Sequence, residues 1–262
     1  MIILSCRKDF TNPEKLIKSP KEIQIRDINL KLGKAVKEIS MEELKVAISG
    51  KSVLILVHGY NKEAKGVYEA YKEIEGRTNY DIVVGFLWTG EDHAIEWYKA
   101  KRKANKSARF LKYILKKLWK ANNNIDLMSH SLGARVTLNA LKQSNSRIIN
   151  NYFCTAGAVD NESLEQGGEF YDSRFKYNNI IIMHSKKDDV LKLSYTIAEL
   201  DIALGLHGPE NKNLVKKRDD IYIVNCENCV EKHGGYDSSD SVHRYINSFN
   251  PPQKRVITLP KN

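Results

Sequence analysis

A five-residue turn with a serine at its tip constrains the fold of this chain more than any other feature. The turn spans 129–133 (SHSLG), follows a short apolar run and leads directly into a segment with helical character. A strand, a tight turn with a central serine and then a helix is typical of a nucleophile elbow. Such a turn needs small residues two positions before and after Ser131, because their backbones crowd against the neighbouring strand and helix. Gly133 fits this need, and Ser129 stands where glycine is usual.

The rest of the chain alternates between short β-branched runs and segments with helical period. Residues 53–57 (VLILV) are continuously apolar, as expected of a strand that is buried on both faces. This alternation predicts an α/β fold, with a mostly parallel central sheet and helices on both faces. Further strands are expected at 81–88, 125–129, 148–155, 180–184 and 221–224, and helices at about 62–75, 92–121, 134–143, 194–204 and 238–249.

No internal repeat, low-complexity tract or linker divides the sequence. Its 262 residues suffice for one α/β domain with a large core, so we expect a single domain over 1–262. The core of that domain would occupy about 50–250. The irregular residues 1–50 would add one or two antiparallel edge strands and a helix at 41–48. Loops above the edge of the sheet are expected at 156–179 and 205–220, which are rich in Gly, Asn and charged residues.

Composition points to a globular chain without a membrane span. The sequence is 42% hydrophobic and 28% charged, and no stretch approaches the roughly 18 apolar residues that a bilayer requires. The apolar start is short and is followed by its positive charges, the reverse of a signal peptide. We therefore expect a cytoplasmic protein. Cys226 and Cys229 form a lone C-x-x-C, which favours reduced thiols at a strand end, with a disulfide or a metal site as the alternatives.

The net charge of +10 is concentrated in one expected helix. Residues 99–120 contain ten Lys or Arg side chains and no Asp or Glu, so this segment alone accounts for the net charge of the chain. The simple interpretation is a solvated cationic face. The alternative is attraction to an anionic surface, although no specific nucleic-acid motif accompanies the segment. Its apolar residues recur every three or four positions and predict a buried stripe: Trp97, Ala100, Ala104, Ala108, Leu111, Leu115 and Leu118.

A serine nucleophile needs a base to take its proton and an acid to orient that base. In sheets with a nucleophile elbow the chain order is serine, acid, histidine. Asp188 follows a late strand and is the expected acid, with its neighbour Asp189 as the alternative. His233 follows the last expected strand in a glycine-rich loop and is the expected base. His243 lies within the final helix and is the weaker candidate.

Acyl transfer also needs two N–H donors for the developing oxyanion. The amide of Leu132 is one candidate, because it follows the serine at a helix N-terminus. The second candidate is the amide of Tyr60, in the His58-Gly59-Tyr60 sequence that ends the buried strand at 53–57. The turn should direct the side chain of His130 away from the serine hydroxyl, which leaves it a packing or supporting role.

Five short motifs lie near the ends of the expected strands: 57–61 (VHGYN), 86–88 (FLW), 129–133 (SHSLG), 185–188 (SKKD) and 233–236 (HGGY). This series resembles that of the α/β-hydrolase superfamily. It is most similar to the bacterial group of α/β hydrolases of unknown function, which is related to lipases and esterases. The resemblance covers about residues 50–250, and the chain departs from it in its first 50 residues and at Ser129.

The resemblance implies a serine hydrolase with a triad of Ser131, Asp188 and His233 and with oxyanion donors at Tyr60 and Leu132. It supplies no substrate. We expect cleavage of a small-molecule ester or related acyl bond through an acyl-enzyme, without a metal or organic cofactor. The alternative is an inert hydrolase-like binding module that uses the basic helix at 99–120 as its contact surface. The substrate pocket is expected to be walled by 156–179 and 205–220, with Phe170, Tyr171 and Phe175 as aromatic candidates.

Overall fold

The computed structural model describes residues 1–60, 63–90 and 97–262. The strands are β1 (Ile2–Ser5), β2 (Gln24–Asn29), β3 (Lys34–Glu38), β4 (Val53–Val57), β5 (Ile82–Leu87), β6 (Ile125–His130), β7 (Asn151–Thr155), β8 (Asn179–His184), β9 (Ile221–Asn225) and β10 (Val256–Thr258). The longer helices are α1 (Met41–Ile48), α2 (Ala64–Arg77), α3 (Trp97–Trp119), α4 (Gly133–Lys142) and α8 (Asp240–Ser248). Short helical segments are η1 (Pro20–Glu22), η2 (Tyr171–Lys176), η3 (Leu191–Tyr195), α5 (Thr196–Glu199), α6 (Leu204–His207) and α7 (Leu214–Lys217).

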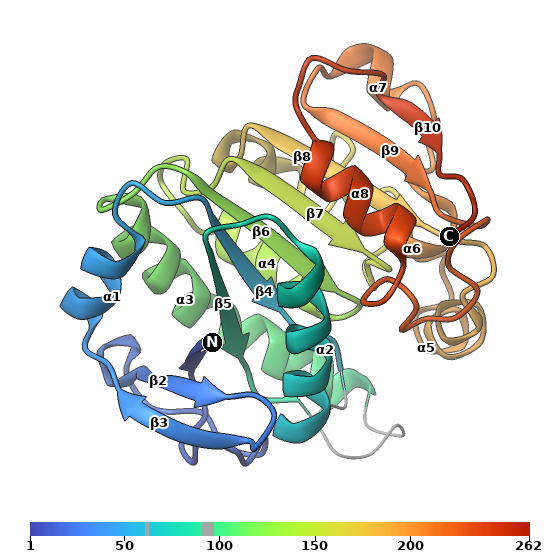
Figure 1. Ribbon diagram of the computed structural model, residues 1–262. Helices are drawn as coiled ribbons and strands as arrows, with labels where there is room; N and C mark the ends of the chain where they lie inside the picture. The colour runs from blue at the N-terminus through green and yellow to red at the C-terminus, as the bar shows by residue number, and fades with distance from the viewer. Residues whose placement is uncertain (61–62, 91–96) are drawn as a thin grey trace.

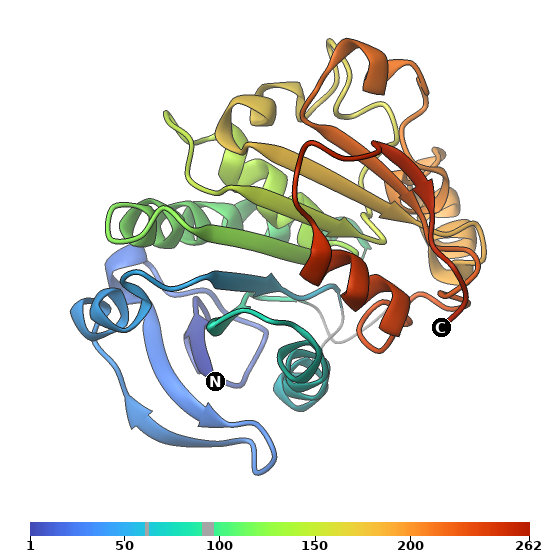
Figure 2. The ribbon, with the colours of Figure 1, turned by 45° about the horizontal axis from the view of Figure 1, so that its top comes forward.

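The strands form one ten-stranded sheet in the order β10-β9-β8-β7-β6-β4-β5-β1-β2-β3 (Figure 1). Neighbours from β10 to β1 pair in parallel, and β2 and β3 extend the sheet by antiparallel pairing. Helices α2 and α8 cover one face, and α3 and α4 cover the other (Figures 1 and 2). The expected α/β fold with a mostly parallel sheet is confirmed.

Burial explains why these segments form strands and helices. All five residues of β4 are buried, as a continuous apolar run in a central strand requires. The stripe of α3 also faces inward, since Ala100, Ala104, Ala108, Leu111, Leu115 and Leu118 are all buried. Ser40 caps helix α1: its hydroxyl accepts the N–H of Glu43, while the Glu43 carboxylate accepts the N–H of Ser40. This reciprocal capping fixes the start of the helix.

Three expectations differ from the structure in detail. The helix expected at 194–204 begins as the π-helical turn η3, continues as α5 and ends at Leu200, which has a left-handed φ of 57°. The segments expected as loops also contain short helices: η2 lies within 156–179, and α7 and most of α6 lie within 205–220. The edge strand β10 was not expected. Asn61 and the starts of the helices expected at 62–75 and 92–121 lie outside the described residues.

The parallel strands direct their carboxyl ends to one edge of the sheet, where loops from β4, β6, β8 and β9 meet. Open α/β sheets bind their ligands at this edge. Of the helices that the structure describes, none has both the length and the apolar character that a bilayer span demands.

Candidate active site

Ser131 occupies a sharp turn between β6 and α4. Its φ is 53°, in the left-handed region that non-glycine residues seldom adopt. The backbone is held there because the Ser131 N–H donates to the Thr155 carbonyl at 3.0 Å, while the Ser131 carbonyl accepts the N–H of Ala158 at 3.1 Å. The hydroxyl is thereby fixed at the carboxyl end of the sheet, as in a nucleophile elbow.

The turn is crowded on both sides. A Cβ on Gly133 would lie 2.5 Å from the carbonyl oxygen of His58, and a Cβ on Gly59 would lie 2.9 Å from the Cβ atom of Ser131. At Ser129, where glycine is usual, the hydroxyl shares a 2.6 Å hydrogen bond with the Tyr152 hydroxyl. The elbow therefore accepts the extra oxygen of Ser129 because that oxygen has a partner.

The structure brings Asp188 and His233 into contact. His233 Nδ1 donates to Asp188 Oδ2 at 2.7 Å, and the other carboxylate oxygen accepts the N–H of Leu191 at 2.9 Å. The Asp188 side chain is fully buried. Asp189, the alternative acid, is exposed and accepts only the N–H of its neighbour Val190 among the described residues. Asp188 is thus the carboxylate that orients this imidazole and leaves its Nε2 for the cavity.

Two further hydrogen bonds fasten the loop of His233. His130 Nε2 donates to the carbonyl oxygen of His233 at 2.8 Å, and the two rings lie 4.6 Å apart. Ser185, in the loop of Asp188, donates its hydroxyl to the Val230 carbonyl at 2.8 Å. The elbow, the acid loop and the histidine loop are therefore joined to one another. His130 thus contacts the loop of His233, and it also lines the cavity that Ser131 and His233 share.

Ser131 and His233 line one cavity of about 640 Å³. Within the described part of the chain, no direct hydrogen bond connects the Ser131 hydroxyl with the His233 ring. Such bonds are often long in ligand-free sites and shorten when substrate binds. Two of the three candidate triad residues thus share one cavity, and the buried Asp188 contacts His233 from outside the cavity lining.

The two candidate oxyanion donors belong to the residue after Ser131 and to the loop that follows β4. The N–H of Leu132 makes no hydrogen bond to any residue of the described ranges, and it precedes the first turn of α4. Near Tyr60, His58 Nδ1 donates to the Gly59 carbonyl at 2.7 Å, and His58 Nε2 accepts the N–H of Trp88 at 3.2 Å. His58 therefore fixes the peptide that carries the Tyr60 N–H.

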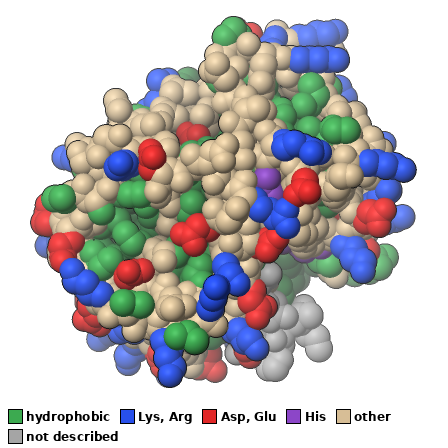
Figure 3. Space-filling model, viewed as in Figure 1, with side chains coloured by type: hydrophobic (Ala, Val, Ile, Leu, Met, Phe, Trp, Pro, Cys, Tyr) green, Lys and Arg blue, Asp and Glu red, His purple; other side chains and the backbone are tan. Residues whose placement is uncertain are grey.

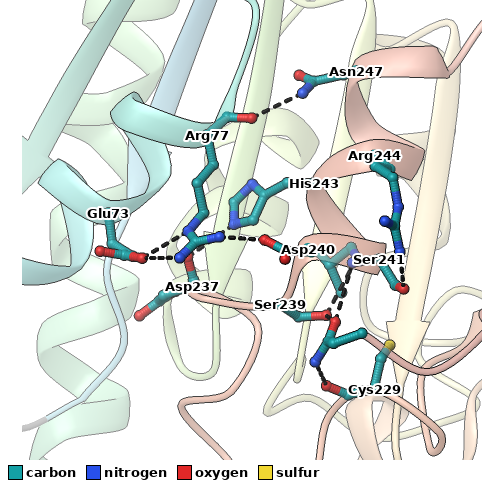
Figure 4. A network of polar contacts seen from close by, with 12 residues as sticks. Glu73, Arg77, Cys229, Asp237, Ser239, Asp240, Ser241, His243, Arg244 and Asn247 are labelled. Atoms are coloured by element: carbon teal, nitrogen blue, oxygen red, sulfur yellow. Dashed lines mark hydrogen bonds and ion pairs between the residues drawn. The ribbon is translucent and has the colours of Figure 1, made fainter.

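His243, the alternative base, belongs to a different group of side chains. Its Nε2 donates to the carbonyl of Asp237 at 2.8 Å, and burial lowers the pKa of its ring. Figure 4 shows it beside Arg77, which pairs with Glu73 on the same helix and with Asp240 on α8. The ion pairs of Arg77 join α2 to α8, and His243 lies beside them and does not line the cavity of Ser131 and His233.

The cavity wall differs from the one expected. Apart from Ala158, the described residues of 156–179 and 205–220 do not line the cavity. Phe170 is fully buried beneath the Arg135 guanidinium, and neither Tyr171 nor Phe175 reaches the cavity. The wall comes from the β4 loop, the start of α3 and the segment after β8, and includes Tyr60, Trp97, Leu191, Tyr195 and Ile197.

Two cysteine thiols and one cluster of acidic side chains lie outside the candidate active site. Cys226 and Cys229 are buried and free, and a hydrogen bond from the Cys226 thiol lowers the pKa of Cys229 to about 7. Among the described residues, one acidic group has the spacing of cation ligands, namely Asp160, Glu162 and Asp201. Acidic side chains at a surface often gather without an ion, and neither group reaches Ser131.

Comparisons with known proteins extend over most of the chain. The family model "Alpha/beta hydrolase of unknown function (DUF900)" matches residues 35–235, and no curated protein matches the chain. The solved structure of esterase PE8 is 15% identical, covers 77% of this chain and 94% of its own, and has a TM-score of 0.48. The ydeN gene product of B. subtilis is 16% identical, with coverages of 75% and 97% and a TM-score of 0.45. The lin2722 gene product of Listeria innocua is 10% identical, with coverages of 79% and 97% and a TM-score of 0.49.

Proposed function

We propose that this chain, which belongs to the family of α/β hydrolases of unknown function, is a serine hydrolase that cleaves an ester or a related acyl bond. Ser131 is the nucleophile, His233 the general base and acid, and Asp188 the group that orients the imidazole. The N–H groups of Leu132 and Tyr60 are the oxyanion donors. The substrate is a small molecule, and the proposed reaction uses no metal or organic cofactor.

The reaction follows from these positions in two halves. His233 Nε2 takes the proton of the Ser131 hydroxyl while its oxygen attacks the carbonyl carbon, and the two N–H donors stabilise the oxyanion that forms. His233 then protonates the departing alcohol oxygen, which leaves an acyl group on Ser131. Water, deprotonated by the same nitrogen, attacks the acyl carbon; the bond to the Ser131 oxygen then breaks, His233 returns the proton to that oxygen, and the acid leaves. Asp188 keeps the proton of the imidazole on Nδ1 throughout.

The hydrogen bond of 2.7 Å between His233 and Asp188 supports this proposal more than any other observation. The carboxylate is buried and bound on both oxygens, so it holds the ring in one tautomer and one orientation. That ring lines the same cavity as a serine in a strained turn. Strained backbone of this kind is concentrated at functional sites.

Replacement of Ser131 by alanine tests the proposal directly. We expect the wild-type protein to hydrolyse p-nitrophenyl acetate and Ser131→Ala to lose that hydrolysis, with an unchanged thermal unfolding temperature. A fluorophosphonate probe should label Ser131 and spare Ser194, a second serine that lines the cavity. Full activity in Ser131→Ala, or a label on Ser194, would refute the assignment.

The charge of α3 favours a second candidate, an inert module that binds an anionic partner. Several cations on this helix are exposed and make no ion pair with any residue in the described ranges: Arg102, Lys106, Arg109 and Lys116. The same probe separates the two candidates, because an unreactive Ser131 together with salt-sensitive retention on heparin would favour the module.

A further inference from the structure

The cavity has a polar end and an apolar wall. Ser131, His130 and His233 line the polar end. The wall begins at Tyr60, whose ring forms a T-shaped pair with Trp97 at a centroid distance of 6.4 Å. Trp97 forms a second T-shaped pair with Tyr195, at a centroid distance of 5.5 Å. An apolar surface of aromatic rings therefore starts beside the candidate oxyanion donor and leads away from it.

The wall continues to the surface as a row of aliphatic side chains. Val190 and Ile197 line the cavity and are 43% and 74% exposed, and the same segment carries two further exposed leucines, Leu193 at 60% and Leu200 at 89%. Of these four side chains, Val190 and Ile197 are the two that line the cavity, and Leu193 and Leu200 lie on the same stretch of chain around η3 and α5. Figure 3 shows hydrophobic side chains at its lower right margin, where Figure 1 places α5. An exposed apolar patch of this kind usually marks a binding surface.

Leu200 adds an independent sign. Its φ of 57° lies in the left-handed region, where glycine or asparagine normally ends a helix. The left-handed backbone conformation does not favour leucine. Because 89% of its surface is exposed, the side chain is also not stabilised by burial in the core. This side chain is explained if it covers an apolar ligand.

The segment is fastened to α3. The Glu199 carboxylate accepts the indole N–H of Trp97 and pairs with Lys101. The Tyr98 hydroxyl donates to the Ala198 carbonyl at 2.6 Å. The aliphatic row is therefore part of a preformed wall, which binds an apolar chain with little ordering.

We propose that this track holds the alkyl chain of an unbranched medium- or long-chain fatty acyl ester. The inference rests on the proposed function, since it names the substrate class of that site. Among the described residues that line the cavity away from its polar end, Ser194 alone lacks an apolar or aromatic body. A peptide or a sugar would leave buried polar groups without partners there, whereas an alkyl chain has none to satisfy.

The geometry assigns the track to the acyl side of the ester. The acyl chain is bonded to the carbon that carries the oxyanion, so it starts next to Tyr60 and Leu132. The alcohol oxygen must lie near His233, which protonates it. Because the aromatic wall begins at Tyr60, it can take the acyl chain as soon as that chain leaves the reacting carbon.

A series of p-nitrophenyl esters from acetate to dodecanoate, kept below micelle-forming concentrations, tests the proposal. We expect kcat/KM to rise about fourfold per methylene, which corresponds to about 0.8 kcal/mol per buried CH₂, until the track is filled. The double variant Ile197→Ser with Leu200→Asn should flatten the increase among the longer esters. Val46→Ser, an exposed apolar position on α1, is the matched control and should leave the series unchanged.

Two results would overturn the inference: a series that is flat or highest at acetate, or an equal increase with alcohol length in alkyl acetates but not with acyl length. Failure of the proposed function gives a different result, because no ester would then be cleaved. In that case, displacement of a fluorescent fatty acid from the Ser131→Ala protein by dodecanoate still tests the track. Displacement by dodecanoate but not by butyrate supports the site, and no displacement refutes it.

Discussion

At Gly133 the elbow has no room for a methyl group. A Cβ there would lie 2.5 Å and 2.6 Å from the carbonyl oxygens of His58 and Val57. Backbone atoms cannot move away as a flexible side chain can, so Gly133→Ala must displace either the end of β4 or the start of α4. We expect a loss of roughly 1–3 kcal/mol in the free energy of unfolding, measured by urea denaturation.

Gly76 in α2 provides the control for this substitution. Nothing lies within 4 Å of a Cβ added at this position. Gly76→Ala should therefore raise the free energy of unfolding by roughly 0.5–1 kcal/mol, because alanine is the better helix former. Equal effects at the two glycines would contradict the packing that the structure assigns to the elbow.

The two neighbouring carboxylates after β8 should differ sharply in their effect on catalysis. Asp188→Asn replaces an oxygen that accepts from His233 Nδ1, so the ring loses its orientation and its favoured tautomer. We expect kcat for p-nitrophenyl acetate to fall about 10⁴-fold. Asp189→Asn alters an exposed side chain and should leave kcat near the wild-type value. If kcat fell further in Asp189→Asn than in Asp188→Asn, Asp189 would be the carboxylate that orients His233.

At the scale of elements, the sequence predicted the central strands, which are buried on both faces. It did not predict the short strand β10 at the edge of the sheet. The run 53–57 is apolar at every position, and only a central strand buries such a run. Strand β10 has three residues, two of them exposed, and its place depends on the free edge of β9. The end of α5 at Leu200 was also missed, because no Gly or Asn marks it.

In the candidate site, too, some features could be predicted from the sequence and others could not. The chemistry-bearing residues could be selected because parallel strands bring their carboxyl ends together, and Asp188 and His233 do meet there. The pocket wall was assigned to the wrong loops, because composition does not reveal which loop folds over the elbow. Phe170 has the aromatic character of a pocket residue but packs beneath Arg135 on α4. Only tertiary packing decides between these two places.

The attachment of α5 to α3 is open to a direct test. The Glu199 side chain is only 10% exposed, and its removal leaves the Trp97 indole N–H and the Lys101 ammonium without this partner. We expect Glu199→Ala to lower the free energy of unfolding by roughly 1–3 kcal/mol and to speed proteolytic cleavage near 190–200. Glu42→Ala, which removes the exposed partner of Lys45, is the matched control and should change little. Equal behaviour of the two variants would show that the attachment does not stabilise the wall.

On the scale of the whole molecule, the positively charged helix α3 and the candidate active site lie largely in different places. The cations of α3 lie along a helix on one face of the sheet, whereas the candidate site lies at the carboxyl edge of the strands. The two meet only where α3 begins, at the Trp97 wall of the cavity. Salt should therefore affect an anionic partner of α3 more than hydrolysis of a neutral ester.

Stability of the whole fold should depend on pH through a buried histidine at the end of β8. Burial, reinforced by the nearby charge of Lys212 and partly opposed by Glu227, lowers the pKa of His184 from 6.5 to about 4. At a pH between these two pKa values, the His184 ring is protonated in the unfolded chain and neutral in the folded protein. The neutral ring thus contributes stability above pH 6.5, and this contribution is lost as the pH falls towards 4.

Urea denaturation at two pH values measures this loss. Between neutral pH and pH ~5, the free energy of unfolding should fall by roughly 2 kcal/mol on account of His184. Burial also lowers the pKa of His243, which acts in the same direction. His184→Phe removes the titrating ring and keeps an aromatic body, so its stability should fall by less over the same interval. If the variant and the wild type lose stability equally, folding does not lower the pKa of His184, and the acid sensitivity must come from other groups.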